Sequence, residues 1–136
     1  MAIKYKTARA ILYYGDRYLL AVHSSFWAAK ERRWGLPGGN IEWRETPQDA
    51  VARELREELD VHLTDFKEVG DFRYKHALHK VFAAELDQEI HDYDESELLD
   101  LQWFSTDDIV QLAANKQLHA GYELRAIQLF QTLIAP

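Results

Sequence analysis

Residues 38–61 constrain this chain more than any other stretch, and they read GGNIEWRETPQDAVARELREELDV. Thr46 is a favourable N-cap, and Pro47 follows at the first helical position, where its missing N–H costs nothing. Apolar residues then recur every four positions, at Val51, Leu55 and Leu59. One face of the predicted helix is therefore apolar and should pack against a core. The stretch predicts a glycine loop followed by an amphipathic helix that ends near Asp60.

Three carboxylates lie along one flank of this predicted helix. Counting about 100° per residue from an apolar stripe at about 0–100°, they fall at about 240°, 300° and 340°, in the order Glu57, Glu54 and Glu58. Like charges at this spacing repel each other. A hard cation such as Mg²⁺ or Mn²⁺ prefers oxygen ligands together with phosphate, and it would compensate for that repulsion.

The alternative is a solvated acidic face, partly neutralised by Arg53 and Arg56, because runs of charge usually form exposed surfaces. The residues before the helix favour a ligand site instead. The two glycines allow the backbone to approach a ligand closely, and Glu42 and Glu45 add acids beside them. We interpret the stretch as a site for a metal ion and a diphosphate.

The spacing of these positions resembles the Nudix box, usually written G-x5-E-x7-R-E-U-x-E-E-x-G-U with U apolar. Gly39, Glu45 and residues 53–61 match it, with one departure: Asp60 stands where the family has glycine. A left-handed helix end suits glycine better than aspartate, so this departure bears on the local backbone. It leaves the acids of the box intact.

This resemblance implies one domain over residues 1–136 with an α/β fold. The expected architecture is the Nudix α/β/α sandwich, a mixed β-sheet flanked by helices, with the box as a loop–helix–loop. Residues 34–37 (WGLP) and 103–104 (WF) also resemble the family. Strands are predicted over residues 8–14, 18–23, 34–36, 61–74, 78–86 and 99–104. Two further helices are predicted, from residue 105 or 106 to 114 and over 121–134.

The resemblance also implies roles for residues of the box. The implied metal ligands are the carbonyl of Gly39 and the carboxylates of Glu54, Glu57 and Glu58. The implied catalytic residues are Arg53, Glu54, Glu57 and Glu97. Arg53 would hold Glu45 by a charge-assisted hydrogen bond, so that Glu45 and Gly38 support the site. The alternative for Arg53 is a surface ion pair worth less than about 1 kcal/mol.

Residues 88–100 are strongly acidic, and for most of them we expect a solvated loop. The resemblance implies that one acid from this region reaches the site as a further ligand or as general base. Glu97, six residues before Trp103, is our choice, with Glu95 and Asp100 as alternatives.

Substrate contacts are expected outside the box. Aromatic and basic residues in the 24–33 loop could stack a base and pair with phosphates. The same residues could equally form packing and a solvated basic patch. The candidates for substrate binding are Trp27, Arg32, Arg33, Glu42 and Tyr122.

Composition narrows the class of protein. The formal net charge of −7 argues against a nucleic-acid polymer as partner, because phosphate backbones attract basic faces. The chain has no cysteine, no apolar signal-peptide core and no 18-residue apolar run, so we expect a cytoplasmic protein without a membrane span. The sequence leaves the oligomeric state open, a homodimer included.

The expected reaction is metal-dependent hydrolysis of a diphosphate linkage in a nucleoside diphosphate joined to another group. Mg²⁺ (or Mn²⁺) would neutralise charge on the phosphates while a carboxylate takes the proton of water. Nucleoside triphosphates, ADP-ribose and other nucleotide sugars all fit, and the short chain slightly favours a triphosphate. The alternatives are a non-catalytic Nudix-fold module that binds or senses a nucleotide, and a plain interaction domain.

Overall fold

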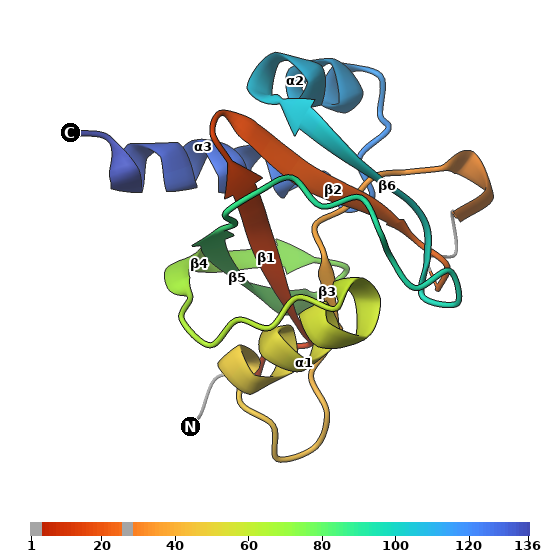
Figure 1. Cartoon of the computed structure of the whole chain (residues 1–136), viewed down its shortest axis with the longest axis vertical. Helices are drawn as coiled ribbons and strands as arrows, with labels where there is room; N and C mark the ends of the chain where they lie inside the picture. Colours follow the sequence, from red (N-terminus) through yellow and green to blue (C-terminus); the bar gives the residue numbers. More distant parts are fainter. Residues whose placement is uncertain (1–3, 26–28) are drawn as a thin grey trace.

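The computed structural model describes residues 4–25 and 29–136, and Figure 1 shows its elements along the chain. In chain order they are β1 (Thr7–Tyr14), β2 (Arg17–His23), the 3-10 helix η1 (Ala29–Glu31), β3 (Gly38–Asn40), α1 (Pro47–Leu59), β4 (Lys67–Tyr74), β5 (Ala77–Glu85), β6 (Leu98–Ser105), α2 (Thr106–Ala114) and α3 (Glu123–Ile134). Within this described part, no helix is long and apolar enough to cross a membrane.

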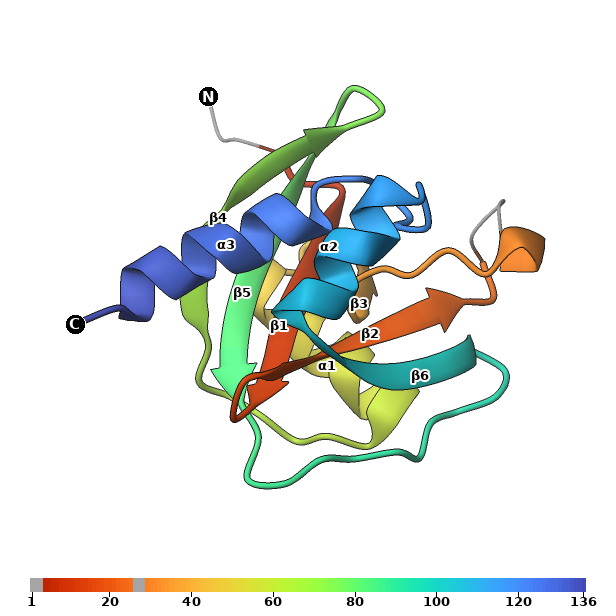
Figure 2. The ribbon, with the colours of Figure 1, turned by 90° about the horizontal axis from the view of Figure 1, so that it is seen from above.

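The strands form one mixed sheet in the order β4-β5-β1-β2-β6, with β3 also paired to β1. β1 and β5 run parallel, and the other neighbouring strands are antiparallel. Figures 1 and 2 show α1 on one face of the sheet and α2 and α3 on the other. The predicted α/β/α sandwich with a mixed sheet is confirmed.

β1 separates two apolar cores because its side chains alternate between the faces of the sheet. Toward α1 it presents the fully buried residues Ala8, Ala10 and Leu12. Toward α2 and α3 it presents Ile11, which is also fully buried. The apolar stripe predicted for the box helix is part of the first core, with Val51 and Leu55 fully buried. Packing on both faces therefore fixes the sheet, and with it the loop that precedes α1.

β1 and β2 part from one another, and the chain after η1 fills the gap between them. β1 pairs with β2 near the tip of their hairpin and with β3 at the opposite end. Gly35 exchanges two backbone hydrogen bonds with Ala21 of β2, at 2.8 and 2.9 Å, and the carbonyl of Pro37 accepts one from Ala10 of β1. This segment therefore positions Gly38 and Gly39 beside β1.

Two predicted strand boundaries are wrong. Residues 34 and 35 form isolated bridges, and the strand here is β3, made by the glycines themselves. Pro37 has no N–H to continue a ladder, so the chain passes from β2 to β1 at this point. The strand predicted over 61–74 begins at Lys67, because three earlier side chains pack into the core beneath α1: Val61, Leu63 and Phe66.

Both ends of α1 follow the sequence signals. The Thr46 side chain accepts a hydrogen bond from the backbone N–H of Asp49, as an N-cap does. At the other end, Asp60 has φ 53° and ψ 36°, in the left-handed region, and its N–H bonds to the carbonyl of Arg56. Aspartate thus adopts the backbone conformation that the family's glycine would adopt at lower cost.

We expect Asp60→Gly to raise the free energy of unfolding by about 0.5–1 kcal/mol, because glycine removes the strain of a Cβ at positive φ. The exposed contact of Asp60 with His62 offsets little of this gain. Urea unfolding measures the change. Asp60→Ala is the control, since it removes the same carboxylate and keeps the Cβ. An equal gain in both variants would assign the effect to the negative charge at the helix C-terminus instead.

Candidate active site

Glu58 of α1 lies against the loop that β3 opens. Its side chain is 2% exposed, and Oε1 accepts a hydrogen bond from the N–H of Gly38 at 3.0 Å. Gly38 has φ 126°, and a Cβ there would lie 2.3 Å from the carbonyl oxygen of Ala8. Only glycine therefore allows the loop to lie between β1 and the helix.

Glu54 lies one turn earlier on the same flank, directly over Gly39. A Cβ on Gly39 would lie 2.6–2.7 Å from the atoms of the Glu54 carboxylate. Burial is the main cause that raises the pKa of Glu54 to about 7; the nearby charge of Glu58 adds to it, and Arg53 opposes it. The Glu58 carboxylate is thus close enough to disfavour a negative charge on Glu54.

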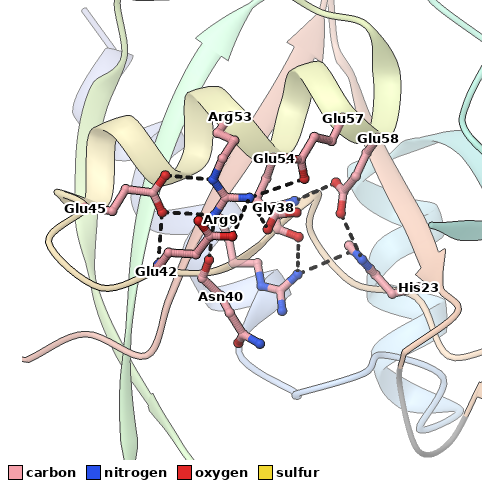
Figure 3. A network of polar contacts seen from close by, with 10 residues as sticks. All are labelled: Arg9, His23, Gly38, Asn40, Glu42, Glu45, Arg53, Glu54, Glu57 and Glu58. Atoms are coloured by element: carbon pink, nitrogen blue, oxygen red, sulfur yellow. Dashed lines mark hydrogen bonds and ion pairs between the residues drawn. The ribbon is translucent and has the colours of Figure 1, made fainter.

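Arg53 ties the loop before the helix to the acidic flank, as Figure 3 shows. Its Nε and Nη2 donate to the two oxygens of Glu45 at 2.7 and 2.9 Å, and Nη2 also donates to the carbonyl of Asn40 at 3.0 Å. Its Nη1 donates to Glu54 at 3.1 Å and to Glu57 at 3.2 Å. The hydrogen bonds from Arg53 lower the pKa of Glu45. One guanidinium therefore orients three carboxylates.

A second network lies on the other side of the glycines and was missed from the sequence. Nη1 of Arg9 donates to the carbonyl of Gly38 at 2.8 Å and lies 3.4 Å from Nε2 of His23. Nδ1 of His23 lies 3.3 Å from Oε2 of Glu58, which closes a ring of contacts through Gly38 (Figure 3). Arg9 belongs to β1 and His23 to β2. The signal in the sequence that could have indicated them is a basic residue within an otherwise apolar strand.

These networks border a pocket of about 440 Å³. Gly39, Glu54 and Glu58 line it. Lys6, Arg9, Glu97, Tyr122 and the loop residue His119 line it as well. Carboxylates, cations and aromatic rings therefore border a single cavity.

Part of the pocket wall is formed by Tyr122 and His79, whose rings stack. Tyr122 is 4% exposed and stacks on Phe72 and His79, with ring centroids 5.2 and 5.9 Å away. Burial, reinforced by positive charges of which Arg9 is the largest contributor, lowers the pKa of His119 to about 3. Its imidazole is therefore neutral at physiological pH, and the wall offers flat surfaces and neutral donors rather than extra charge.

The other predicted substrate contacts lie elsewhere. Glu42 is 69% exposed and 3.7 Å from Arg53, and Glu57 is 48% exposed and turned toward the same arginine. Arg32 pairs with Asp100, whereas Arg33 pairs with Glu31 at 2.8 Å and lines a second hollow. Trp27 lies outside the described residues. The structure thus gathers Glu97 and Tyr122 with Glu54 and Glu58 in one pocket, whereas Arg32, Glu42 and Glu57 do not line it.

The donor set fits a small divalent cation. Carboxylate and carbonyl oxygens are the ligands Mg²⁺ prefers, and one or two carboxylates completed by water and phosphate are usual for it. Among the described residues, no three His, Asp or Glu side chains converge into a complete ligand cluster. The protein would therefore supply Glu54, Glu58 and the Gly39 carbonyl, and the substrate and water would supply further ligands.

The profile of the NUDIX domain matches residues 4–125 of the 136. The chain belongs to the Nudix family. Two curated Nudix relatives are a nucleoside triphosphate pyrophosphatase/Nudix hydrolase fusion protein of Bifidobacterium longum and the NAD-capped RNA hydrolase NudC of Yersinia enterocolitica. The first is 31% identical over 68% of this chain and 20% of its own length, and the second is 32% identical over 70% and 36%. The chain thus spans about a fifth to a third of the length of these relatives.

Among solved structures, the NUDIX domain of Shewanella oneidensis NrtR, crystallised with ADP-ribose, superimposes with a TM-score of 0.77. It is 20% identical, and the match covers 99% of this chain and 91% of that one. This likeness supports the Nudix fold, and the predicted family is confirmed.

Gly39→Ala should leave the Nudix fold intact and weaken metal binding at least about tenfold, because its Cβ would displace the flexible Glu54 side chain. Thermal unfolding with increasing Mg²⁺ measures this, since a cation that binds the folded state stabilises it. Gly38→Ala is the comparison. Its Cβ meets the backbone of β1, so it should lower the free energy of unfolding by about 3 kcal/mol or more without Mg²⁺. Unchanged Mg²⁺ affinity in Gly39→Ala would contradict the placement of Glu54.

Arg53→Lys should reduce catalytic turnover about 10- to 100-fold, because lysine cannot make the two-nitrogen contact to Glu45 while also reaching Glu54 and Glu57. Steady-state kinetics at saturating Mg²⁺ test this. Arg56→Lys, an exposed substitution on the same helix, is the matched control. Equal kinetics for both variants would show that the Arg53 network is a surface ion pair.

Proposed function

We propose that this Nudix protein hydrolyses a diphosphate linkage in a nucleoside diphosphate joined to another group, and that it releases a nucleoside monophosphate. The observation that carries the proposal is the packing of Glu54 and Glu58 against Gly38 and Gly39 in the 440 Å³ pocket. A carboxylate pair there attracts a divalent cation, and a cation attracts diphosphate. The pocket beyond has room and flat surfaces for the rest of a nucleotide.

In this proposal Mg²⁺ or Mn²⁺ would be held by the Gly39 carbonyl, Glu54 and Glu58, which line the pocket. Glu57, whose exposed side chain contacts Arg53, would turn toward the ion and add a further ligand oxygen. When bound, the ion supplies Lewis-acid chemistry: it neutralises charge on phosphate oxygens and lowers the pKa of water. Arg53 orients Glu54 and holds Glu57 beside it, and the ring through Arg9 and His23 keeps Glu58 in place. These contacts order the ligand side chains before the metal ion binds, so less side-chain freedom is lost on binding.

Glu97 is our proposed general base, which takes a proton from the attacking water onto its carboxylate. Its side chain lines the same pocket as Glu54 and Glu58. Its carbonyl accepts two hydrogen bonds from Ser24, one from the backbone N–H and one from the hydroxyl, both at 3.0 Å. The end of β2 thereby holds this part of the acidic loop at the mouth of the site.

For the substrate we propose a nucleotide whose phosphates lie between the metal site and the cations Lys6 and Arg9. Its base or sugar would pack on the wall formed by Tyr74, His79 and Tyr122. The names of the two relatives refer to a nucleoside triphosphate and to NAD-capped RNA. Both kinds of molecule contain phosphoanhydride bonds, so residues beyond the box must choose among such substrates. A cysteine-free chain also suits the cytoplasmic setting that we propose.

Glu57→Gln and Glu54→Gln should each lower Mg²⁺-dependent turnover at least about 100-fold with the fold retained, because each removes a charged ligand oxygen. A panel of nucleoside triphosphates, dinucleoside polyphosphates and nucleotide sugars, with product identification, measures this. Glu85→Gln, an exposed change at the end of β5, is the control and should keep full activity. Wild-type turnover in Glu57→Gln would remove Glu57 from the metal site, and wild-type turnover in both variants would overturn the proposed mechanism.

A further inference from the structure

A second hollow, of about 350 Å³, adjoins the main pocket. Three residues line both cavities: Tyr74, His119 and Ala120. Tyr74 ends β4, and the other two belong to the connection between α2 and α3. The two hollows therefore lie side by side, with these shared residues between them.

The boundary between the two cavities is aromatic. The rings of Tyr74 and His119 meet edge to face, with centroids 5.6 Å apart. Nζ of Lys75 lies 5.5 Å from the centroid of the Tyr74 ring. Flat rings with a cation nearby suit a ribose or base that passes between two charged groups.

The second hollow is basic. Arg33 and Lys116 line it, and the described residues of its lining include no aspartate or glutamate. It differs in this from the main pocket, which Glu54 and Glu58 line, and from the chain as a whole, whose net charge is −7. The positive charges of Lys75 and Arg33 also contribute to the low pKa of His119. The main pocket thus offers carboxylates to a cation, and the second hollow offers cations to an anion.

We propose that Arg33 and Lys116 bind a further phosphate group of the substrate, one that is not part of the diphosphate linkage that is cleaved. The inference rests on the proposed function and deepens it. The scissile diphosphate lies at Glu54 and Glu58, the connecting nucleoside passes Tyr74 and His119, and the remote phosphate lies in the second hollow. The preferred substrate is then a nucleotide with a remote phosphate rather than a simple nucleotide sugar.

The existing partner of Arg33 does not prevent this. Arg33 and Glu31 are 33% and 48% exposed, and such exposed pairs contribute little, so a phosphate can replace the carboxylate. A phosphate carries more charge than a carboxylate and accepts two parallel hydrogen bonds from a guanidinium. Glu31 therefore acts as a weak competitor whose removal should strengthen phosphate binding.

Two substrate pairs test the proposal and distinguish the sources of the phosphate. NADPH and NADH differ by a phosphate monoester on the 2′-oxygen of the adenosine ribose, and coenzyme A and dephospho-coenzyme A differ by one on the 3′-oxygen, so both phosphates lie across a nucleoside from the diphosphate. The measured quantity is the ratio of kcat/KM within each pair, with Mg²⁺ present. We expect the wild type to prefer the phosphate-rich member of at least one pair about tenfold, mainly through KM, and the preference should fall as salt rises from about 0.05 to 0.5 M.

The variants assign that preference to residues. Arg33→Gln/Lys116→Gln should reduce the ratio to about 1–2 while kcat/KM for the phosphate-poor member changes less than about twofold, and Glu31→Gln should increase the ratio. Arg125→Gln, an exposed change on α3, is the control and should keep the wild-type ratio. A wild-type ratio near 1 in both pairs, or a ratio that survives the double variant, would overturn the second phosphate site alone. Absence of turnover for every diphosphate tested would instead overturn the proposed function.

Discussion

The close approach of the Gly38–Gly39 segment to β1 on one side and to α1 on the other is the constraint on which the structure depends. Gly38 donates its N–H to Glu58, and its carbonyl accepts from Arg9. A buried carboxylate is costly unless it is paired and hydrogen-bonded, and here the backbone and His23 supply those contacts. The loop, the strand and the helix therefore hold one another in position, and the acids of the box are ordered before any ligand arrives.

Two arginines from different elements contact the charged and polar groups of the site. Arg53 belongs to α1 and gathers Glu45, Glu54 and Glu57, so it works along the helix surface. Arg9 belongs to β1 and contacts Gly38 and His23, so it acts on the site from the sheet. Between them lie the carboxylates of α1, and burial together with the neighbouring charge of Glu58 raises the pKa of Glu54 to about 7. A site of this kind stores repulsion that a divalent cation relieves.

Features that depend on neighbouring residues could be predicted from the sequence. Contacts between segments that are distant in the chain could not. The start of α1 and its apolar stripe follow from spacings of a few residues, the contact between Arg53 and Glu45 follows from the resemblance to the Nudix box, and the structure contains all three. His23 contacts Glu58, and Arg9 contacts His23, from strands that are distant from α1 in the chain. No spacing pattern in the sequence predicts these contacts. The strand at residues 34–36 was misplaced for a similar reason, since the divergence of β1 and β2 decides where the chain can pair.

The parallel pairing of β1 with β5 also governs how the protein folds. Thr7 is the partner of His79, so the centre of the sheet closes a loop that contains the whole box and both of its networks. Closing such a loop costs entropy before its contacts return any stabilisation, which slows folding. The box helix can form early, because its own signals are local, and the contacts of its acids lie in segments made before β5. During synthesis the pocket would nevertheless be completed late, because His79 and Tyr122, which line it, belong to segments that follow the box.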